Sequence, residues 1–463
     1  MWRVFKFVLF ALGAIVPLGG GVLTAMVLQF NHSPSAFHYG KPKSALEAQR
    51  QDIDYFMKLL SMDRSFSALQ RAHANSRLKE MADAKVALSP PAFRVALMEI
   101  AALSDNGHTS VTSGGGAMPM QLPVRVAGFS DGIYVMQATK PYADLLGGKV
   151  TAIDGHPIAE VMRRLEQLRG GVPGWRKAYA ETYISQLDVL VGTGISPDLR
   201  QSVWTVVSPS RVSVTHTLIP YRQPDREPTL FVKVNYSNHP PAELGPNWVS
   251  FQPDTAPSAT FANFEEPFRH FRVPHSCAMF VQLKSSEDEG QAHISDFLAG
   301  TRADMEANKP CALILDNRFN DGGDYINLAR WASALPRLVS GKIIVLISPM
   351  TFSAGITTVG FVKQAGDGRV MLIGEPVGDR LAFYSEGNRG CLPNFHLCLN
   401  YRTGKHDYAH PCTDWRVCFW PNWLFPVRVS SLAPDRTLAM SFEDWRMGRD
   451  PAYDEALKLV GSK

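Results

Sequence analysis

Short apolar runs alternate with helix-length segments in the last third of the chain. Residues 312–316 and 342–348 are rich in Ile, Leu and Val, as in strands buried on both faces, and residues 369–374 have the same character. Helix-length segments at 325–335 and 354–364 separate these runs. This order predicts a right-handed parallel crossover unit, in which functional groups gather at the carboxyl ends of the strands.

The first half of the chain carries two other patterns. Residues 44–103 have apolar positions at helical spacing, with Ser44 and Ser89 as candidate N-caps. A strand-rich region follows, with a helical insertion at 172–199. The predicted class is α/β. Its expected parts are an N-terminal signal or anchor, a helical domain, a β-module, a linker rich in Pro, Asn and Ser, and an α/β domain, over residues 4–30, 44–110, 111–235, 236–262 and 263–463.

The N-terminal segment is uncharged over residues 7–30 and follows Arg3 and Lys6. Its length is sufficient for one helix across a hydrocarbon core. Pro17 and the glycines at 19–21 interrupt it, which keeps a cleaved signal peptide open as the alternative. Because no clean small-x-small cleavage site follows, we expect an uncleaved signal anchor in the membrane, with the rest of the chain exported to the periplasm or the cell exterior.

The charge of the chain and the placement of its cysteines indicate which partners and which redox compartment to expect. The formal charge of +4 is mild and unclustered over the 463 residues, which argues against a nucleic-acid partner. Cys277 and Cys311 lie at or near predicted core strands, where buried thiols are expected. The other four cysteines do not have the paired C-x-x-C spacing of a zinc site, so no metal is expected. Local disulfides suit an exported chain better than four free thiols, with Cys391–Cys398 and Cys412–Cys418 as the favoured pairs, although spacing alone does not fix the pairing.

Two unusual features fall at the carboxyl ends of the predicted strands. One is a turn that contains Gly322 and Gly323, whose backbone N–H groups are not obstructed by side chains. The other is Ser353, which comes just after a strand and opens a helix. A nucleophilic serine needs an exposed hydroxyl, a base and N–H donors for the oxyanion, and Gly322, Gly323 and Ala354 are candidate donors. The alternative is a plain α/β core with Ser353 as an N-cap.

Three segments in this region resemble motifs of one enzyme family. Asp316–Asp324 is similar to the D-x-R-x-N-x-G-G signature of the tail-specific, or C-terminal-processing, serine peptidases and their tricorn-like relatives. Thr351–Gly355 resembles the nucleophile motif of that family, and Gly374–Gly378 resembles the G-E-P-T-G turn that follows it. The resemblance implies a crotonase/ClpP-like core and a serine endopeptidase in which Ser353 is the nucleophile and no cofactor takes part.

The general base is implied by a further resemblance. Leu103–Val111 is similar to the L-x-D-x-H-T motif of the tricorn-like branch, in which the histidine, here His108, takes the serine proton. The processing branch uses a lysine instead, at the place where this chain has Gly378. The chain therefore fits a Ser–His pattern, although Gly107 stands where the tricorn-like branch has a serine before the histidine.

The acid that orients the histidine stays open between two residues. Asp105 is close to His108 in sequence, and Glu386 lies in a segment that recurs among relatives. Either carboxylate completes the logic of a Ser–His–acid triad. A role as a helix cap or a surface group suits each of them equally well.

The first half of the chain contains a second resemblance, to a peptide-binding module, which bears on the predicted function. Asp131–Val135 and Val150–Ile158 resemble strands of a PDZ-like module, which captures extended peptides by strand addition, with a purely structural β-module as the alternative. We predict a serine peptidase that acts on proteins or peptides. The alternative function is an inactive relative that binds a peptide or an apolar ligand in the same cleft. An α/β-hydrolase esterase is disfavoured because Thr351 stands where its nucleophile elbow requires glycine.

Overall fold

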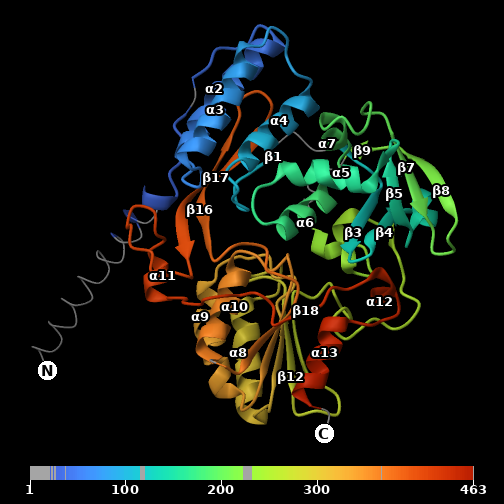
Figure 1. Cartoon of the computed structure of the whole chain (residues 1–463), viewed down its shortest axis with the longest axis vertical. Coiled ribbons are helices and arrows are strands. Elements are labelled where there is room, and N and C mark those ends of the chain that lie inside the picture. Colours follow the sequence, from blue (N-terminus) through green and yellow to red (C-terminus); the bar gives the residue numbers. More distant parts are fainter. Residues whose placement is uncertain are drawn as a thin grey trace, which may run out of the picture.

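The computed structural model describes residues 21, 24–25, 28–36, 38–114, 120–222, 232–366 and 368–461. Figure 1 shows two bodies stacked along the long axis, with a sheet-and-helix body below and the N-terminal helices beside a β-rich part above. The predicted α/β class is therefore confirmed. The long orange hairpin near the C-terminus of the chain rises from the lower body into the upper one.

The lower body is built on a six-stranded sheet. Its order is β11-β12-β13-β14-β15-β18, in which only the edge strand β11 is antiparallel. The strands are β11 (Phe268–Arg272), β12 (Met279–Leu283), β13 (Leu313–Asp316), β14 (Ile343–Ile347), β15 (Val370–Gly374) and β18 (Arg436–Thr437). The predicted crossover unit is present as β13, β14 and β15, with the expected helices between them.

Helices cover both faces of this sheet because its central strands are apolar on both faces. Leu313 and Leu315 pack into the cluster formed with α8 (Ile294–Asn308), α9 (Ile326–Leu338) and α10 (Ala354–Gly366). Ile314, between them, packs on the opposite face against α13 (Pro451–Val460). Figure 1 shows α8, α9 and α10 on one side of the sheet and α13 on the other.

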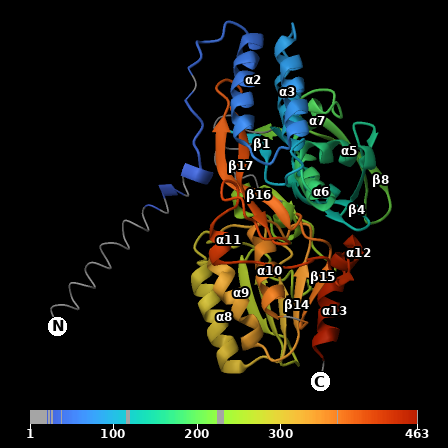
Figure 2. The same cartoon turned by 60° about the vertical axis from the view of Figure 1, so that its left-hand side comes forward.

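The N-terminal helices are completed by strands from the far end of the chain. The helices are α2 (Ala45–Met62), α3 (Ala68–Asp83) and α4 (Pro90–Ala102), and Ser44, Ser67 and Ser89 cap them as N-caps. They pack beside a three-stranded sheet of β1 (Ser110–Ser113), β17 (Leu397–Asp407) and β16 (Ala382–Cys391). Asp52 on α2 accepts hydrogen bonds from the backbone N–H groups of Asn394 and Phe395 at the tip of the hairpin, at 3.0 and 2.9 Å. Figure 2 shows this hairpin running alongside α2.

The β-module is a seven-stranded sheet with the order β10-β4-β5-β7-β8, plus β3 on β4 and β6 on β5. Its strands are β3 (Val124–Phe129), β4 (Gly132–Thr139), β5 (Lys149–Ile153), β6 (His156–Pro157), β7 (Ser202–Val207), β8 (Ser213–Leu218) and β10 (Trp248–Ser250). Around it lie α5 (Ile158–Leu165), α6 (Pro173–Tyr183), α7 (Leu187–Gly192) and the short pair of β2 (Met120–Gln121) with β9 (Tyr221–Arg222). Residues 236–262, predicted as a linker, contain the strand β10, which pairs with β4 of the module, and Trp248 in this strand is buried.

Three disulfides pair all six cysteines. The pairs favoured from the sequence, Cys391–Cys398 and Cys412–Cys418, are confirmed. The expectation of buried thiols at Cys277 and Cys311 is wrong, because the two are bonded with their Cα atoms 5.4 Å apart. Parallel pairing of β12 with β13 brings the preceding residues together, and the Cys311 N–H donates to the Cys277 carbonyl at 3.2 Å.

The ends of the chain complete the fold. Two short helices, α11 (Pro421–Leu424) and α12 (Phe442–Arg446), follow the hairpin and flank the lower body. Within the described ranges, no helix has the length and apolar character needed to cross a membrane. The N-terminal anchor predicted over 4–30 lies almost entirely outside these ranges and stays a prediction.

Candidate active site

The loops after β13 and β14 interlock at the carboxyl edge of the sheet. The Phe352 N–H donates to the Asn320 carbonyl at 3.0 Å, and the Asn317 side chain donates to the Gly355 carbonyl at 2.9 Å. A Cβ on Gly355 would lie 2.2 Å from the Asn320 carbonyl oxygen, so glycine is required for this approach. Arg318 in the same loop pairs with Asp316 and with Asp450 at the start of α13, at 2.8 and 2.7 Å. The Asp316–Asp324 motif therefore holds the loop after β13 in place.

Ser353 is held in a strained conformation at the start of α10. Its φ of +52° lies in the left-handed region, which costs about 1–2 kcal/mol for a residue other than glycine. The Ile356 N–H closes the first turn of the helix onto the Ser353 carbonyl at 2.9 Å. A Cβ on Gly322 would lie 3.3 Å from the Ser353 hydroxyl oxygen, so the serine side chain lies against the glycine turn.

Two of the three predicted oxyanion donors are available. Gly322 and Gly323 both have positive φ, +128° and +120°, which turns the backbone amides of this loop. The Gly322 N–H already donates to the Asn320 side-chain oxygen at 3.2 Å. In the described part of the chain, no acceptor is hydrogen-bonded to the N–H of Gly323 or of Ala354. These two amides therefore have N–H groups without a hydrogen-bond acceptor in the described part of the chain, as an oxyanion site requires.

His108 lies next to the serine motif, inside a stack of aromatic rings. Its ring centroid is 4.2 Å from that of Phe352 and 5.2 Å from that of Phe383. The side chain is buried, and neither ring nitrogen has a hydrogen-bond partner among the described residues. Burial and the positive charge of Arg402 hold the pKa of His108 well below its usual value. The imidazole is therefore neutral at pH 7.

The carboxylate that faces His108 is Asp379, which the sequence pattern did not single out. Its Oδ2 atom lies 3.7 Å from Nδ1 of His108. Burial raises the pKa of Asp379 to about 7, although its other oxygen accepts the Arg380 backbone N–H at 2.8 Å. The residue immediately follows Gly378, where the processing branch has its lysine. The lysine that the processing branch has at position 378 was the signal in the sequence that a charged group belongs near this position.

Neither predicted orienting acid is bonded to His108. Asp105 is half-exposed and forms an ion pair with Arg380 at 2.6 Å. Glu386 pairs with a second histidine, His406, at 3.3 Å, and accepts a hydrogen bond from Ser385. Both acids are therefore replaced by Asp379 as the carboxylate in contact with the His108 ring.

A second network of buried polar side chains lies next to the site, and the sequence pattern did not predict it. His406 stacks on the other side of Phe383 at 5.0 Å, and its Nδ1 atom lies 3.2 Å from the Tyr408 hydroxyl. That hydroxyl is 2.7 Å from Thr357 on α10, one turn beyond Ser353. This network ties β16 and β17 to the helix that carries the serine. Across the described ranges, no three His, Cys, Asp or Glu side chains are arranged to hold a metal ion.

An α/β fold that gathers a strained serine, a glycine turn and a buried imidazole–carboxylate pair defines a candidate serine-hydrolase site. No protein-family model matches the sequence, and no curated protein is similar to it at a significant level. Solved structures do match. The structure of mature CPAF complexed with lactacystin has 14% sequence identity, covers 90% of this chain and 98% of its own, and has a TM-score of 0.60.

Two further solved structures match over similar shares of this chain. Mature CPAF alone has 14% identity, covers 90% of this chain and 97% of its own, and has a TM-score of 0.57. The photosystem II D1 C-terminal processing protease is a looser match, with 12% identity, coverage of 87% and 98%, and a TM-score of 0.37. The CPAF structures establish the fold over nearly the whole chain. The α/β fold that the sequence predicts agrees with the fold that this chain shares with mature CPAF.

Proposed function

We propose that this protein is a serine peptidase, an endopeptidase that hydrolyses peptide bonds of protein or peptide substrates through an acyl-enzyme. The single observation that carries the proposal is the conformation of Ser353, strained to φ +52° against the Gly322–Gly323 turn. A structural N-cap gains nothing from such strain, whereas strained residues cluster at functional sites. The fold shared with mature CPAF supports the same conclusion.

In the proposed reaction, the Ser353 hydroxyl attacks the scissile carbonyl and His108 takes its proton. The Nδ1 atom of His108 faces Asp379, so the Nε2 atom is the one assigned to the serine. Asp379 orients the ring and stabilises the imidazolium that forms. The neutral state of the buried imidazole suits this role, because a base must be unprotonated before the attack.

The remaining steps use the backbone amides and water. The N–H groups of Gly323 and Ala354 receive the negative charge that develops on the substrate oxygen, and the positive end of the α10 dipole lies at the same point. His108 then returns its proton to the leaving amine. Water, activated by the same histidine, hydrolyses the acyl-enzyme, so the mechanism requires neither a metal nor a cofactor.

The second candidate function is the inactive relative that binds a peptide or an apolar ligand. One observation favours it: no hydrogen bond joins Ser353 to His108 in the described chain, and aromatic rings surround the imidazole. Hydrogen bonds at catalytic sites often tighten only when substrate binds, so this geometry leaves both functions open to the same experiment.

An exported location is proposed together with the peptidase function. All six cysteines are paired, and disulfides of this number are maintained in oxidising compartments. The uncharged N-terminal segment provides the anchor or the signal. A periplasmic or extracellular substrate protein follows from this location.

Labelling with a fluorophosphonate serine-hydrolase probe tests the proposal. Wild-type protein is expected to be labelled, and Ser353→Ala and His108→Ala are expected to lose the label. Ser340→Ala, at an exposed serine in the loop before β14, is the matched control and should be labelled like the wild type. Folded wild-type protein that takes no label and cleaves no protein would establish the binding function instead.

A further inference from the structure

Exposed apolar side chains gather at one place beside the disulfide loop 412–418. Ten large hydrophobic residues are exposed in the described ranges, and three of them, Trp415, Trp423 and Leu424, lie within ten positions of each other. Their exposed fractions are 61%, 51% and 79%. A fourth, Leu28, is 62% exposed and precedes Gln29, whose side chain donates to the Trp415 carbonyl at 3.4 Å. We call these four residues the aromatic patch.

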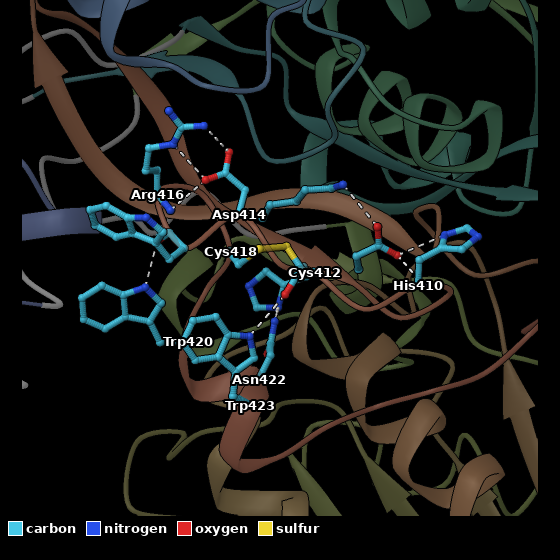
Figure 3. Close-up of a disulfide and its surroundings, with 12 residues drawn as sticks. His410, Cys412, Asp414, Arg416, Cys418, Trp420, Asn422 and Trp423 are labelled. Atoms are coloured by element: carbon cyan, nitrogen blue, oxygen red, sulfur yellow. Dashed lines mark hydrogen bonds and ion pairs between the residues drawn. A yellow bond between two sulfur atoms is a disulfide. The ribbon is translucent and has the colours of Figure 1, made fainter.

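The loop that presents the patch is firmly held. The Cys412–Cys418 disulfide closes it, and the N–H of Phe419 donates to the Lys405 carbonyl at 3.0 Å. Figure 3 shows the indole N–H of Trp423 directed at Cys412, whose carbonyl accepts it at 3.3 Å. Trp420 is fixed in the same way, through a bond of 3.0 Å to the Trp415 carbonyl. The exposed rings therefore lie on a braced loop, which lowers the entropy lost when they are buried.

The same loop contacts the body of the protein through Asn422. Its side-chain nitrogen lies 3.1 Å from Nδ1 of His406, and its oxygen accepts the Tyr325 hydroxyl at 2.7 Å. Both partners are buried. The patch is thus fixed relative to the candidate active site.

The N-terminal segment enters the fold at the patch. Phe30 is fully buried, with its ring centroid 5.6 Å from those of both Phe419 and Trp420. Figures 1 and 2 both place α11 beside the start of the described chain. In the sequence, residues 7–30 contain no charged side chain, so an apolar stretch long enough to enter a bilayer ends where the patch begins.

The basic side chains around the patch are only partly paired. Arg416 pairs with Asp414 at 2.9 Å, and Lys405 pairs with Asp407 at 3.2 Å. Arg64, which donates to the Arg416 carbonyl, has no ion-pair partner among the described residues, so some positive charge is left beside the patch. Tryptophan favours the boundary between headgroups and hydrocarbon, because its ring is apolar and its N–H is polar.

We propose that the aromatic patch docks on the interface of the lipid bilayer that receives the N-terminal segment. Trp415, Trp423 and Leu424 insert at the headgroup level, and the braced loop fixes the height and the tilt of the lower body over the membrane. This inference rests on the patch and the N-terminal sequence, and it stands or falls independently of the peptidase chemistry.

Tryptophan quenching in the full chain, reconstituted into phosphatidylcholine vesicles, tests the docking. The lipids are used with and without bromine near the headgroup end of the acyl chains. The Trp2→Phe variant serves as the reference, called the parent protein, because it lacks the tryptophan of the N-terminal segment. Quenching in the parent therefore reports only on tryptophans of the rest of the chain. Brominated lipid is expected to quench part of the parent emission. Adding Trp415→Phe and Trp423→Phe should reduce the quenched share to less than half.

Matched controls separate docking on lipid from burial of the patch against protein. Trp248→Phe with Trp445→Phe removes two buried tryptophans of the β-module and α12, and the quenched share should stay the same or rise. Leu424→Glu in the parent leaves every remaining tryptophan in place and should also lower the quenching. Equal quenching in the parent and the patch variant would overturn the proposal. So would protection of the patch from aqueous acrylamide without quenching by lipid, because a protein partner or a second copy would then cover it.

Discussion

The Nδ1 atom of His108 lies 3.7 Å from Oδ2 of Asp379, and neither atom has a hydrogen bond in the described part of the chain. Leaving two such polar atoms buried and unpaired costs free energy that packing must offset. A proton shared between them would satisfy both. Because Nε2 is assigned to the serine, Nδ1 carries the proton of the neutral ring, and a closer approach of the two atoms would complete a hydrogen bond to the carboxylate.

Replacing Asp379 with asparagine should remove most of the activity. The amide keeps the shape of the side chain but cannot stabilise the imidazolium, so we expect kcat/KM to fall by about 10²–10⁴-fold. The wild-type rate should rise as pH increases through about 7, where the buried Asp379 loses its proton. The pH–rate profile of a peptide substrate measures both effects. A wild-type profile that is flat between pH 6 and 8, or an unchanged rate in the variant, would contradict the assignment.

The same substitution should make the protein more stable at alkaline pH. Burial raises the pKa of Asp379 above its unfolded value, so the native state binds more protons and stability falls as pH rises between about 4 and 7. Asp379→Asn carries no ionisable group, so we expect its free energy of unfolding at pH 8 to exceed that of the wild type by about 2 kcal/mol. Urea unfolding at pH 5 and pH 8 measures the difference. A variant less stable than the wild type at pH 8 would show that the charged carboxylate is favourably paired.

The sequence predicted the parts of the site that follow from local pattern. Ser353 and Gly322 lie near each other because parallel strands end at one edge of a sheet, and that topology can be inferred from the apolar runs. Asp379 could not be chosen in this way. Its role depends on burial and on packing against the distant loop of His108, whereas its local context is that of an ordinary turn. The Cys277–Cys311 bond was missed for the same reason, since it depends on the register of β12 with β13.

Gly107→Ser should impair the site, although it restores the residue of the tricorn-like pattern. A Cβ at this position would lie 2.9 Å from Cε2 of Phe352 and 3.0 Å from Cδ1 of Trp175. The centroids of these two rings lie 3.6 Å apart, and the Phe352 ring also lies 4.2 Å from that of His108, so a displaced Phe352 would shift against His108. We expect a loss of about 1–3 kcal/mol in stability. A fall in kcat/KM of about tenfold should accompany it.

Gly300→Ser on α8 is the control, because a Cβ at that position meets nothing within 4 Å. Thermal unfolding and peptide cleavage are measured on both variants. Wild-type behaviour in Gly107→Ser would show that the Phe352–Trp175 stack does not hold the histidine in place.

Asp105→Asn should leave catalysis almost unchanged. Asp105 is paired with Arg380 at a half-exposed position, where an ion pair contributes at most about 1 kcal/mol. We expect less than about a threefold change in kcat/KM, in contrast to Asp379→Asn, because Asp105 does not contact the imidazole. Measuring both variants on one substrate compares the two acids directly. A larger loss in Asp105→Asn than in Asp379→Asn would return Asp105 to the orienting role.

Ser353→Gly and Ser353→Ala should both be inactive but should differ in stability. At φ +52° a residue with a Cβ is strained, and glycine relieves the strain, although glycine also loses more backbone entropy on folding. The net expectation is that Ser353→Gly is more stable than Ser353→Ala by about 0.5–1 kcal/mol. Urea unfolding of the two variants under one condition gives this difference without any assay of activity. If the alanine variant is as stable as the glycine variant, the backbone at 353 relaxes once the hydroxyl is gone. The hydroxyl, rather than the turn, would then be what holds the strained conformation.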